Sequence, residues 1–177
     1  MKEVITEQKS DAWRNRIQEL IRLAGEAQAN AYTPYSHYRV GAALLCGDGT
    51  VVKGCNIENA SYGATNCAER TALFAAVAEG KRSFVCLALV AGPESESAGS
   101  REAEGSMTEK GEAKAGEKEH KESAARYPSP CGICRQALRE FVNPSGFPII
   151  MARTETDYRI RTLEELLPDS FGPEDLA

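Results

Sequence analysis

Residues 38–56 read YRVGAALLCGDGTVVKGCN, and the pattern of this stretch indicates the kind of fold the chain adopts. Two runs rich in apolar residues, 38–46 and 50–56, flank the turn-forming residues Gly47, Asp48 and Gly49. A short connection containing Gly and Asp between two such runs is typical of a β-hairpin. We therefore expect two antiparallel strands here.

Helical patterns lie on both sides of this hairpin. Apolar residues recur at helical spacing between Trp13 and Ala24, which predicts an amphipathic helix over 10–31. A second helical pattern, with alanines on one side, covers 67–80. The continuous apolar run 84–90 that follows is typical of a strand buried on both faces.

The end of the chain adds helices and strands of the same kind. The predicted elements are a helix over 131–141, strands over 147–152 and 158–162, and a short final helix over 163–167. The whole order is helix, hairpin, helix, strand, helix, strand, strand. It predicts a single α/β domain over 1–177, with three layers, α/β/α, around a mixed five-stranded sheet.

A segment of different composition interrupts this domain at about 93–127. It contains no Val, Ile, Leu, Phe or Trp, and Glu, Lys, Ala, Gly and Ser dominate it. Such a charged, low-complexity segment cannot bury enough apolar surface to offset the entropy of ordering it. We expect a disordered insert.

Charge and hydropathy exclude several classes of protein. The net charge of −5 argues against nucleic acid as the main partner. No apolar run approaches the roughly 18 residues that a membrane helix needs, and the charged residues 1–8 are not typical of a secretory signal. We therefore expect a cytoplasmic protein, in which paired cysteines indicate a metal or redox site rather than a disulfide.

Three of the six cysteines lie at predicted helix starts: Cys67, and the Cys-x-x-Cys pair Cys131 and Cys134. The pair alone would leave a structural zinc site or a redox pair open as alternatives. Three thiolates with one open position make a catalytic zinc site, whereas structural sites close with four protein ligands. We predict one zinc ion per chain on these three residues. The remaining cysteines, expected to be small core residues, are Cys46, Cys55 and Cys86.

Glu69 lies two residues beyond Cys67, too close to be a fourth ligand without distorting the helix. It is well placed to reach a water at the open position of the metal, as in the zinc deaminases. Arg70 and Arg135 each follow a ligand closely. We predict that they hydrogen-bond the sulfurs and offset the negative charge of three thiolates.

Several stretches, in the right order, resemble the small homotetrameric zinc-dependent cytidine deaminases. They are YSHYRVGAA (35–43), GCNIENA (54–60), CAERTA (67–72), PCGICRQ (130–136) and LLPDSF (166–171). The resemblance covers nearly the whole chain except the insert. It implies hydrolytic deamination of cytidine and deoxycytidine to uridine and deoxyuridine with release of ammonia, in pyrimidine salvage. It also implies zinc on the three predicted cysteines and Glu69 as proton shuttle.

The same resemblance implies substrate contacts. Asn56 and Glu58 resemble the pair that hydrogen-bonds the ribose 3′-hydroxyl, and the backbone N–H of Ala68 resembles the group that holds the pyrimidine 2-oxo group. Phe171 resembles a C-terminal aromatic residue that stacks on the base in a neighbouring subunit. The residues that imply a homotetramer with shared sites are Ala60, Tyr62 and Phe171.

Tyr38 departs from the family pattern, which usually has Phe at this position near the base. The ring is kept, but its hydroxyl needs a partner. Two alternatives stay open: another aminopyrimidine deaminase of the superfamily, of the blasticidin or nucleotide type, and a non-catalytic zinc module. The second requires a fourth protein ligand, and the chain has only two histidines, His37 and His120.

Overall fold

The computed structural model describes residues 11–94 and 126–176. Its helices and strands, in chain order, are α2 (Asp11–Gln28), β1 (Tyr38–Cys46), β2 (Val51–Cys55), η1 (Tyr62–Ala64), α3 (Ala68–Ala78), β3 (Phe84–Pro93), α5 (Gly132–Arg139), β4 (Pro148–Ala152), β5 (Tyr158–Thr162), α6 (Leu163–Leu166) and η3 (Pro173–Leu176). Every predicted helix and strand is confirmed, with ends that differ by at most three residues.

The strands form one five-stranded sheet in the order β2-β1-β3-β4-β5. β1 pairs antiparallel with β2 and with β3, β3 pairs parallel with β4, and β4 pairs antiparallel with β5. The prediction of a mixed five-stranded sheet is therefore confirmed. β3 runs three residues further than predicted because its end pairs with the start of β1, where Tyr38 is opposite Pro93.

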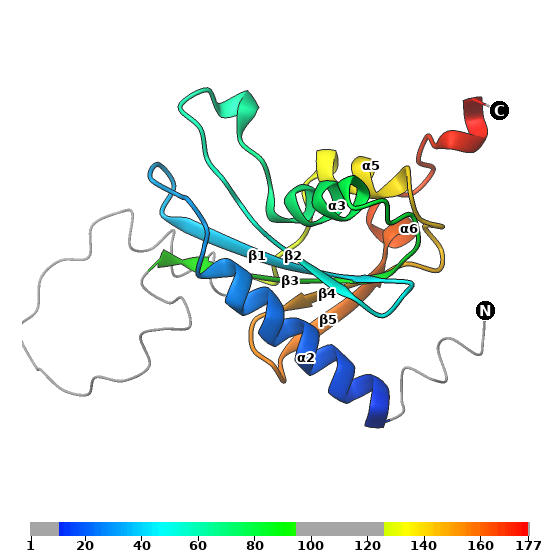
Figure 1. Cartoon of the computed structure of the whole chain (residues 1–177), viewed down its shortest axis with the longest axis horizontal. Helices are drawn as coiled ribbons and strands as arrows, with labels where there is room; N and C mark the ends of the chain where they lie inside the picture. Colours follow the sequence, from blue (N-terminus) through cyan, green and yellow to red (C-terminus); the bar gives the residue numbers. More distant parts are fainter. Residues whose placement is uncertain (1–10, 95–125, 177) are drawn as a thin grey trace, which may run out of the picture.

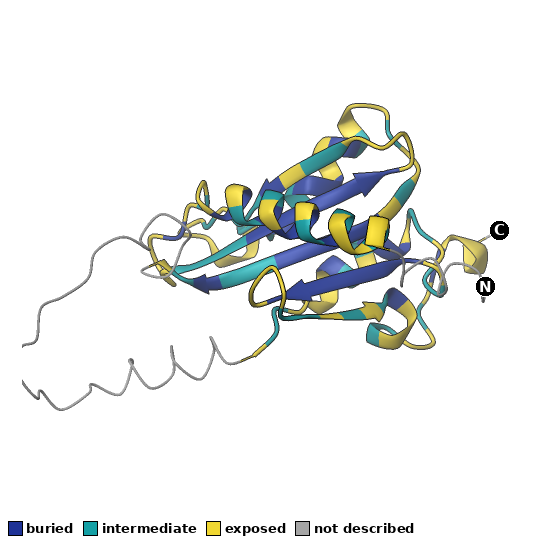
Figure 2. Ribbon diagram, turned by 90° about the horizontal axis from the view of Figure 1, so that it is seen from below, coloured by how far each residue is buried: buried dark blue, intermediate teal, exposed yellow. Residues whose placement is uncertain are grey.

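Helices cover both faces of the sheet, so the three predicted layers are present (Figure 1). Along β1, Ala42 and Leu44 belong to the core cluster under α3 and α6, whereas Ala43 and Leu45 belong to the cluster under α2. This alternation follows from the two-residue period of a strand. Figure 2 shows the resulting buried centre of the sheet and the exposed outer side of α2.

Two glycines of the hairpin let the helices approach the sheet closely. A Cβ on Gly54 would lie 2.3 Å from the carbonyl oxygen of Ala68, at the start of α3. A Cβ on Gly41 would lie 1.9 Å from the carbonyl oxygen of Ala24, in α2. Only residues without a side chain fit there, and the start of α3 is thereby held against β2.

Pro93, which was expected to open the insert, is instead the last residue of β3. Residues 95–125, which include His120, lie outside the described residues, and the expectation of disorder falls there. Within the described ranges, no helix combines the length and the apolar character needed to cross a membrane.

Candidate active site

Three thiols meet where α3 and α5 begin. Cys67 is the N-cap residue of α3 and Cys131 that of α5, and neither side chain caps its helix. Cys134 lies in the first turn of α5, which brings its sulfur to the same place. The Sγ atom of Cys131 is 3.9 Å from that of Cys67 and 3.4 Å from that of Cys134.

These distances suit a zinc ion. With Zn–S bonds of about 2.3 Å in tetrahedral geometry, two ligating sulfurs lie about 3.8 Å apart. All three sulfurs are within 4.8 Å of one another, and in the described part of the chain no fourth side chain joins them. His37, one candidate fourth ligand, instead contacts Glu94, with 3.3 Å between its Nδ1 and the carboxylate. The donor set therefore fits zinc with one position open.

The thiols affect one another's pKa values. A hydrogen bond from Cys134 lowers the pKa of Cys67 to about 5, and Arg70 acts in the same direction. The same hydrogen bond raises the pKa of Cys134. The Nη2 atom of Arg70 lies 3.8 Å from the Cys67 sulfur and donates to the carbonyl oxygen of Thr65 at 3.0 Å. The predicted contact of Arg70 with a sulfur is present.

The corresponding prediction for Arg135 is wrong. Its guanidinium donates to the carbonyl oxygen of Pro130 at 2.7 Å, to that of Leu166 at 2.5 Å and to Ser129 Oγ at 3.1 Å. Two of these acceptors precede α5 in the chain and the third lies in α6, and none of them is a thiol. Arg135 holds the segment that leads into the Cys131–Cys134 pair.

Glu69 lies in the first turn of α3 and is only 5% exposed. Burial raises the pKa of its carboxyl to about 7, and the neighbouring Cys67 adds to the rise. The side chain lines a cavity of about 370 Å³, within the range of ligand pockets. The predicted site residues that share this cavity are Tyr38, Asn56, Cys67, Ala68, Glu69 and Cys131.

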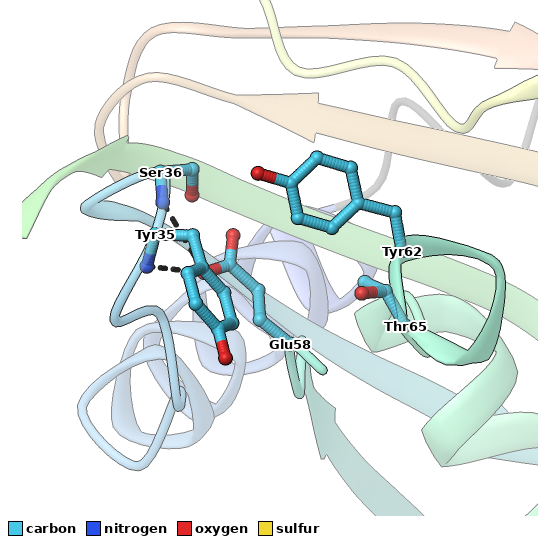
Figure 3. A pocket seen from close by; sticks show the side chains of 5 residues that line it. All are labelled: Tyr35, Ser36, Glu58, Tyr62 and Thr65. Atoms are coloured by element: carbon cyan, nitrogen blue, oxygen red, sulfur yellow. Dashed lines mark hydrogen bonds between the residues drawn. The ribbon is translucent and has the colours of Figure 1, made fainter. Parts of the chain in front are cut away.

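A second hollow of about 320 Å³ adjoins this cavity, because Thr65 lines both. Glu58 and Tyr62 line it, as Figure 3 shows. One carboxylate oxygen of Glu58, Oε2, accepts hydrogen bonds from the backbone N–H groups of Tyr35 at 3.0 Å and Ser36 at 3.2 Å. The structure thus brings Glu58 and Tyr62 into a hollow next to the cavity that two of the predicted zinc ligands line.

Asn56 is fixed from both ends of its amide. Its Oδ1 accepts from the backbone N–H of Val40 at 2.8 Å, and its Nδ2 donates to the carbonyl oxygen of Tyr38 at 2.9 Å. An amide has two N–H groups and an oxygen with two lone pairs. One N–H and one lone pair therefore remain for a ligand in the cavity.

Two predicted contacts line neither hollow, namely Ala60 and Phe171. Phe171 is 59% exposed, and its carbonyl oxygen accepts a hydrogen bond from Gln136 at 3.0 Å. In a single chain it is thus separate from the thiols. Among the expected core cysteines, Cys46 and Cys86 are buried, but Cys55 is half-buried and donates to a carbonyl oxygen of Asn30.

Sequence reasoning missed several lining residues: Thr65, Arg126, Tyr127 and Ser129. The last three come just before the Cys131–Cys134 pair, so their position in the chain was a usable signal. No feature of the sequence marked Thr65, because only the tertiary structure places it in the wall of both hollows.

Known proteins resemble this chain along most of its length. Residues 14–146 match the family described as the cytidine and deoxycytidylate deaminase zinc-binding region. The chain is 41% identical to a cytidine deaminase of Sporosarcina psychrophila, over 91% of this chain and 95% of that protein. It is 40% identical to one of Halalkalibacterium halodurans, over 90% and 96% of the two chains.

A solved structure, that of a cytidine deaminase from Burkholderia pseudomallei, has the same fold with a TM-score of 0.65 and 37% identity. The similarity covers 86% of this chain and 97% of the solved one. Together with the three-thiol centre, these similarities show that the chain belongs to the zinc-binding cytidine and deoxycytidylate deaminase family.

Proposed function

We propose that this chain hydrolyses the 4-amino group of cytidine and deoxycytidine, giving uridine or deoxyuridine and ammonia, in pyrimidine salvage. The observation that carries the proposal is a cavity lined by Asn56, the buried Glu69 and two of the three clustered thiols, with Glu58 in the adjoining hollow. The relatives at 40–41% identity are themselves named cytidine deaminases. A nucleoside substrate and reduced, metal-binding thiols suit a cytoplasmic enzyme.

Zinc bound by Cys67, Cys131 and Cys134 would lower the pKa of a water and so supply a nucleophile at neutral pH. Glu69 is two residues from the first ligand and faces the same cavity. It takes a proton from the attacking water and delivers it to N3 of the base. It then carries the remaining proton, from the hydroxyl added at C4, to the amino group, which leaves as ammonia as the C4 carbonyl forms.

The rest of the cavity orients the nucleoside. The free N–H of Asn56 donates to the sugar 3′-hydroxyl, and the Glu58 carboxylate accepts from it. Solvent loss raises the pKa of Glu58, but hydrogen bonds from Ser36 and Tyr35 outweigh it, so its pKa lies below the ordinary value. The backbone N–H of Ala68 holds the 2-oxo group of the pyrimidine, and the Tyr38 ring packs near the base.

An absorbance assay of the purified protein tests the proposal. The absorbance of the 4-aminopyrimidine base should fall as cytidine or deoxycytidine is consumed. The Glu69→Gln variant, which keeps the shape of the side chain but cannot carry the proton, should turn over at least ~10²-fold more slowly. Deoxycytidylate and blasticidin-type aminopyrimidines are the competing substrates. If one of them has the higher kcat/KM, the chain is a different deaminase of the superfamily. If zinc-loaded protein turns over none, it is a zinc module.

A homotetramer with shared active sites is part of the proposal. Exposed apolar side chains gather beside α5, where Ile133 is 65% exposed, Phe74 48% and Phe171 59%. Patches of this kind mark interaction sites. In the assembly, Phe171 stacks on the base in a neighbour's cavity, and Ala60 and Tyr62 lie at the same interface.

Mixing inactive chains tests this shared site. Glu69→Gln chains and Phe171→Ala chains are each expected to be impaired. If Phe171 of one subunit completes the cavity that holds Glu69 of its neighbour, reassembled mixtures contain some cavities in which both residues are intact. Such mixtures should regain activity. A fully active monomer in light scattering at the assay concentration would exclude shared sites.

A further inference from the structure

We propose that Glu94 is a positioning residue, which fixes residues 35–40 (the 35–40 loop, whose last three residues begin β1) and through them the groups that hold the sugar. The inference rests on the proposed function, since it assigns Asn56 and Glu58 to the sugar. Glu94 lies outside the motifs that carry the family resemblance. It is the last described residue before the 95–125 segment.

Backbone groups of the 35–40 loop hydrogen-bond both of the sugar-binding side chains. Its first two N–H groups, Tyr35 and Ser36, donate to Glu58. Its end holds Asn56, through the Tyr38 carbonyl oxygen and the Val40 N–H group. Residues 38–40 also pair with β3, so a shift at 35–37 changes the position of Glu58 directly and that of Asn56 through the start of β1.

His37, at the centre of this loop, has a conformation that needs support. Its φ is 52°, in the left-handed region that side-chain-bearing residues adopt rarely. Glu94 contacts it twice. The Glu94 backbone N–H donates to the His37 carbonyl oxygen at 2.9 Å, and its carboxylate lies 3.3 Å from His37 Nδ1.

The same carboxylate reaches the other side of the loop. Its Oε1 accepts a hydrogen bond from Arg39 Nη2, while Nη1 of that guanidinium donates to the carbonyl oxygen of Ala29 at 3.1 Å. Ala29 directly follows α2. Glu94 thus links His37, in the centre of the loop, through Arg39 to the end of a packed helix.

Removal of this carboxylate should leave the fold intact. The Glu94 side chain is 47% exposed and belongs to neither core cluster. The β1–β3 pairing reaches Pro93 without it. The thiols and Glu69 lie at the starts of α3 and α5. The hydrogen bonds of Glu94 described above go to His37 and Arg39, not to these helices. The expected defect is therefore one of sugar binding, not of the chemical step.

Glu94→Ala should raise KM for cytidine by about tenfold, with kcat within about twofold of wild type and unchanged zinc content. The matched control is Glu26→Ala. Glu26 also accepts from two cations, Arg22 and Lys53, but on the outer side of α2. This control should keep the wild-type KM. Glu94→Gln, which retains an acceptor for Arg39, should recover part of the loss.

Two further measurements separate positioning from a general weakening. With 2′,3′-dideoxycytidine, which lacks the 3′-hydroxyl, the KM ratio of Glu94→Ala to wild type should fall to about one. Amide hydrogen exchange of a peptide covering 35–40 should be faster in Glu94→Ala and unchanged in Glu26→Ala. An equal KM rise for both nucleosides, or unchanged exchange, overturns the proposal.

The amide hydrogen exchange of the 35–40 peptide can be measured whether or not the protein is an active enzyme. An inactive wild type would refute the proposed function, whereas exchange would still decide whether Glu94 holds the loop. The two failures are therefore distinguishable.

Discussion

The candidate active site has two halves that are built differently. The zinc half, formed by Cys67, Cys131, Cys134 and Glu69, sits on the first turns of two helices that pack on the sheet. The sugar half, formed by Asn56, Glu58 and the 35–40 loop, is held by side-chain to backbone hydrogen bonds at the partly exposed end of the hairpin.

The difference follows from what each half has to do. Reacting groups must be held to a fraction of an ångström, and helix starts in contact with a packed core supply that rigidity. Groups that bind a sugar hydroxyl tolerate more movement, and loops on a rigid scaffold are the usual place for them. We therefore expect damage to the zinc half to abolish turnover and damage to the sugar half to weaken binding.

The largest effect is expected from Cys134→Ala. It removes a fully buried ligand, so zinc should fall from one ion per chain to a small fraction by elemental analysis. Turnover should fall by at least about a thousandfold, because the group that generates the nucleophile is lost.

Cys86→Ala is the matched control for this experiment. Cys86 is equally buried, in the core under α2, and burial raises the pKa of its thiol to about 12. It should keep zinc and activity and lose about 1 kcal/mol of stability. Retained zinc in Cys134→Ala, or lost zinc in Cys86→Ala, would contradict the assignment of the ligands.

A smaller effect is expected from Asn56→Ala in the sugar half. kcat/KM for cytidine should fall by about 10- to 100-fold, mainly through KM, while zinc stays bound. The Val40 N–H and the Tyr38 carbonyl oxygen also lose their partner, which destabilises the fold by about 1–3 kcal/mol. A fall confined to kcat would show that Asn56 acts on the reaction centre instead.

The two halves also differ in how far the sequence predicted them. Each zinc ligand belongs to a short motif at a helix start, so the spacing of Cys67, Glu69 and the Cys131–Cys134 pair implied a common site. The strands were predictable for the same reason, because apolar runs and the 47–49 turn are local patterns. Arg135 was misassigned because its partners, Pro130 and Leu166, depend on how α5 packs on the chain around it.

The sugar half needed the fold. Asn56 and Glu58 were assigned only by family resemblance, since in isolation they are two polar residues at a strand end. Their orientation depends on backbone groups about 16 to 23 residues away in the chain. Thr65 and Glu94 belong to no periodic pattern, and only the tertiary structure places them at this side of the cavity.

Tyr38→Phe should have a still smaller effect. The substitution restores the residue that is usual in the family and removes one hydroxyl, while the backbone contact with Asn56 is unchanged. We expect kcat/KM for cytidine within about twofold of wild type, a difference of ~0.5 kcal/mol. A change beyond tenfold would show that the hydroxyl contacts the substrate, which a comparison of inhibitor affinities for the two proteins would verify.

The smallest effect on activity is expected when residues 95–125 are replaced by about eight Gly and Ser residues. This segment joins the two halves, since Glu94 precedes it and the stretch that leads to Cys131 follows it. Its flanking residues are near each other: Pro93 pairs with Tyr38, and Arg126 lines the same cavity as Tyr38. Eight extended residues span at most about 26–29 Å.

Shortening the connection should slightly stabilise the protein. Each halving of loop length lowers the closure free energy by only ~0.6 kcal/mol, so a reduction of about fourfold gives ~1 kcal/mol. The segment has no large aliphatic residue to contribute to a core. Glu94 must be kept in the shortened chain, because its loss would raise KM for a different reason. Zinc content checks that the junction has not displaced Cys131. If the shortened protein keeps zinc and its thermal midpoint but kcat/KM falls more than tenfold, the segment contacts the substrate, and the two halves are then joined by a functional part of the site rather than by a passive connection.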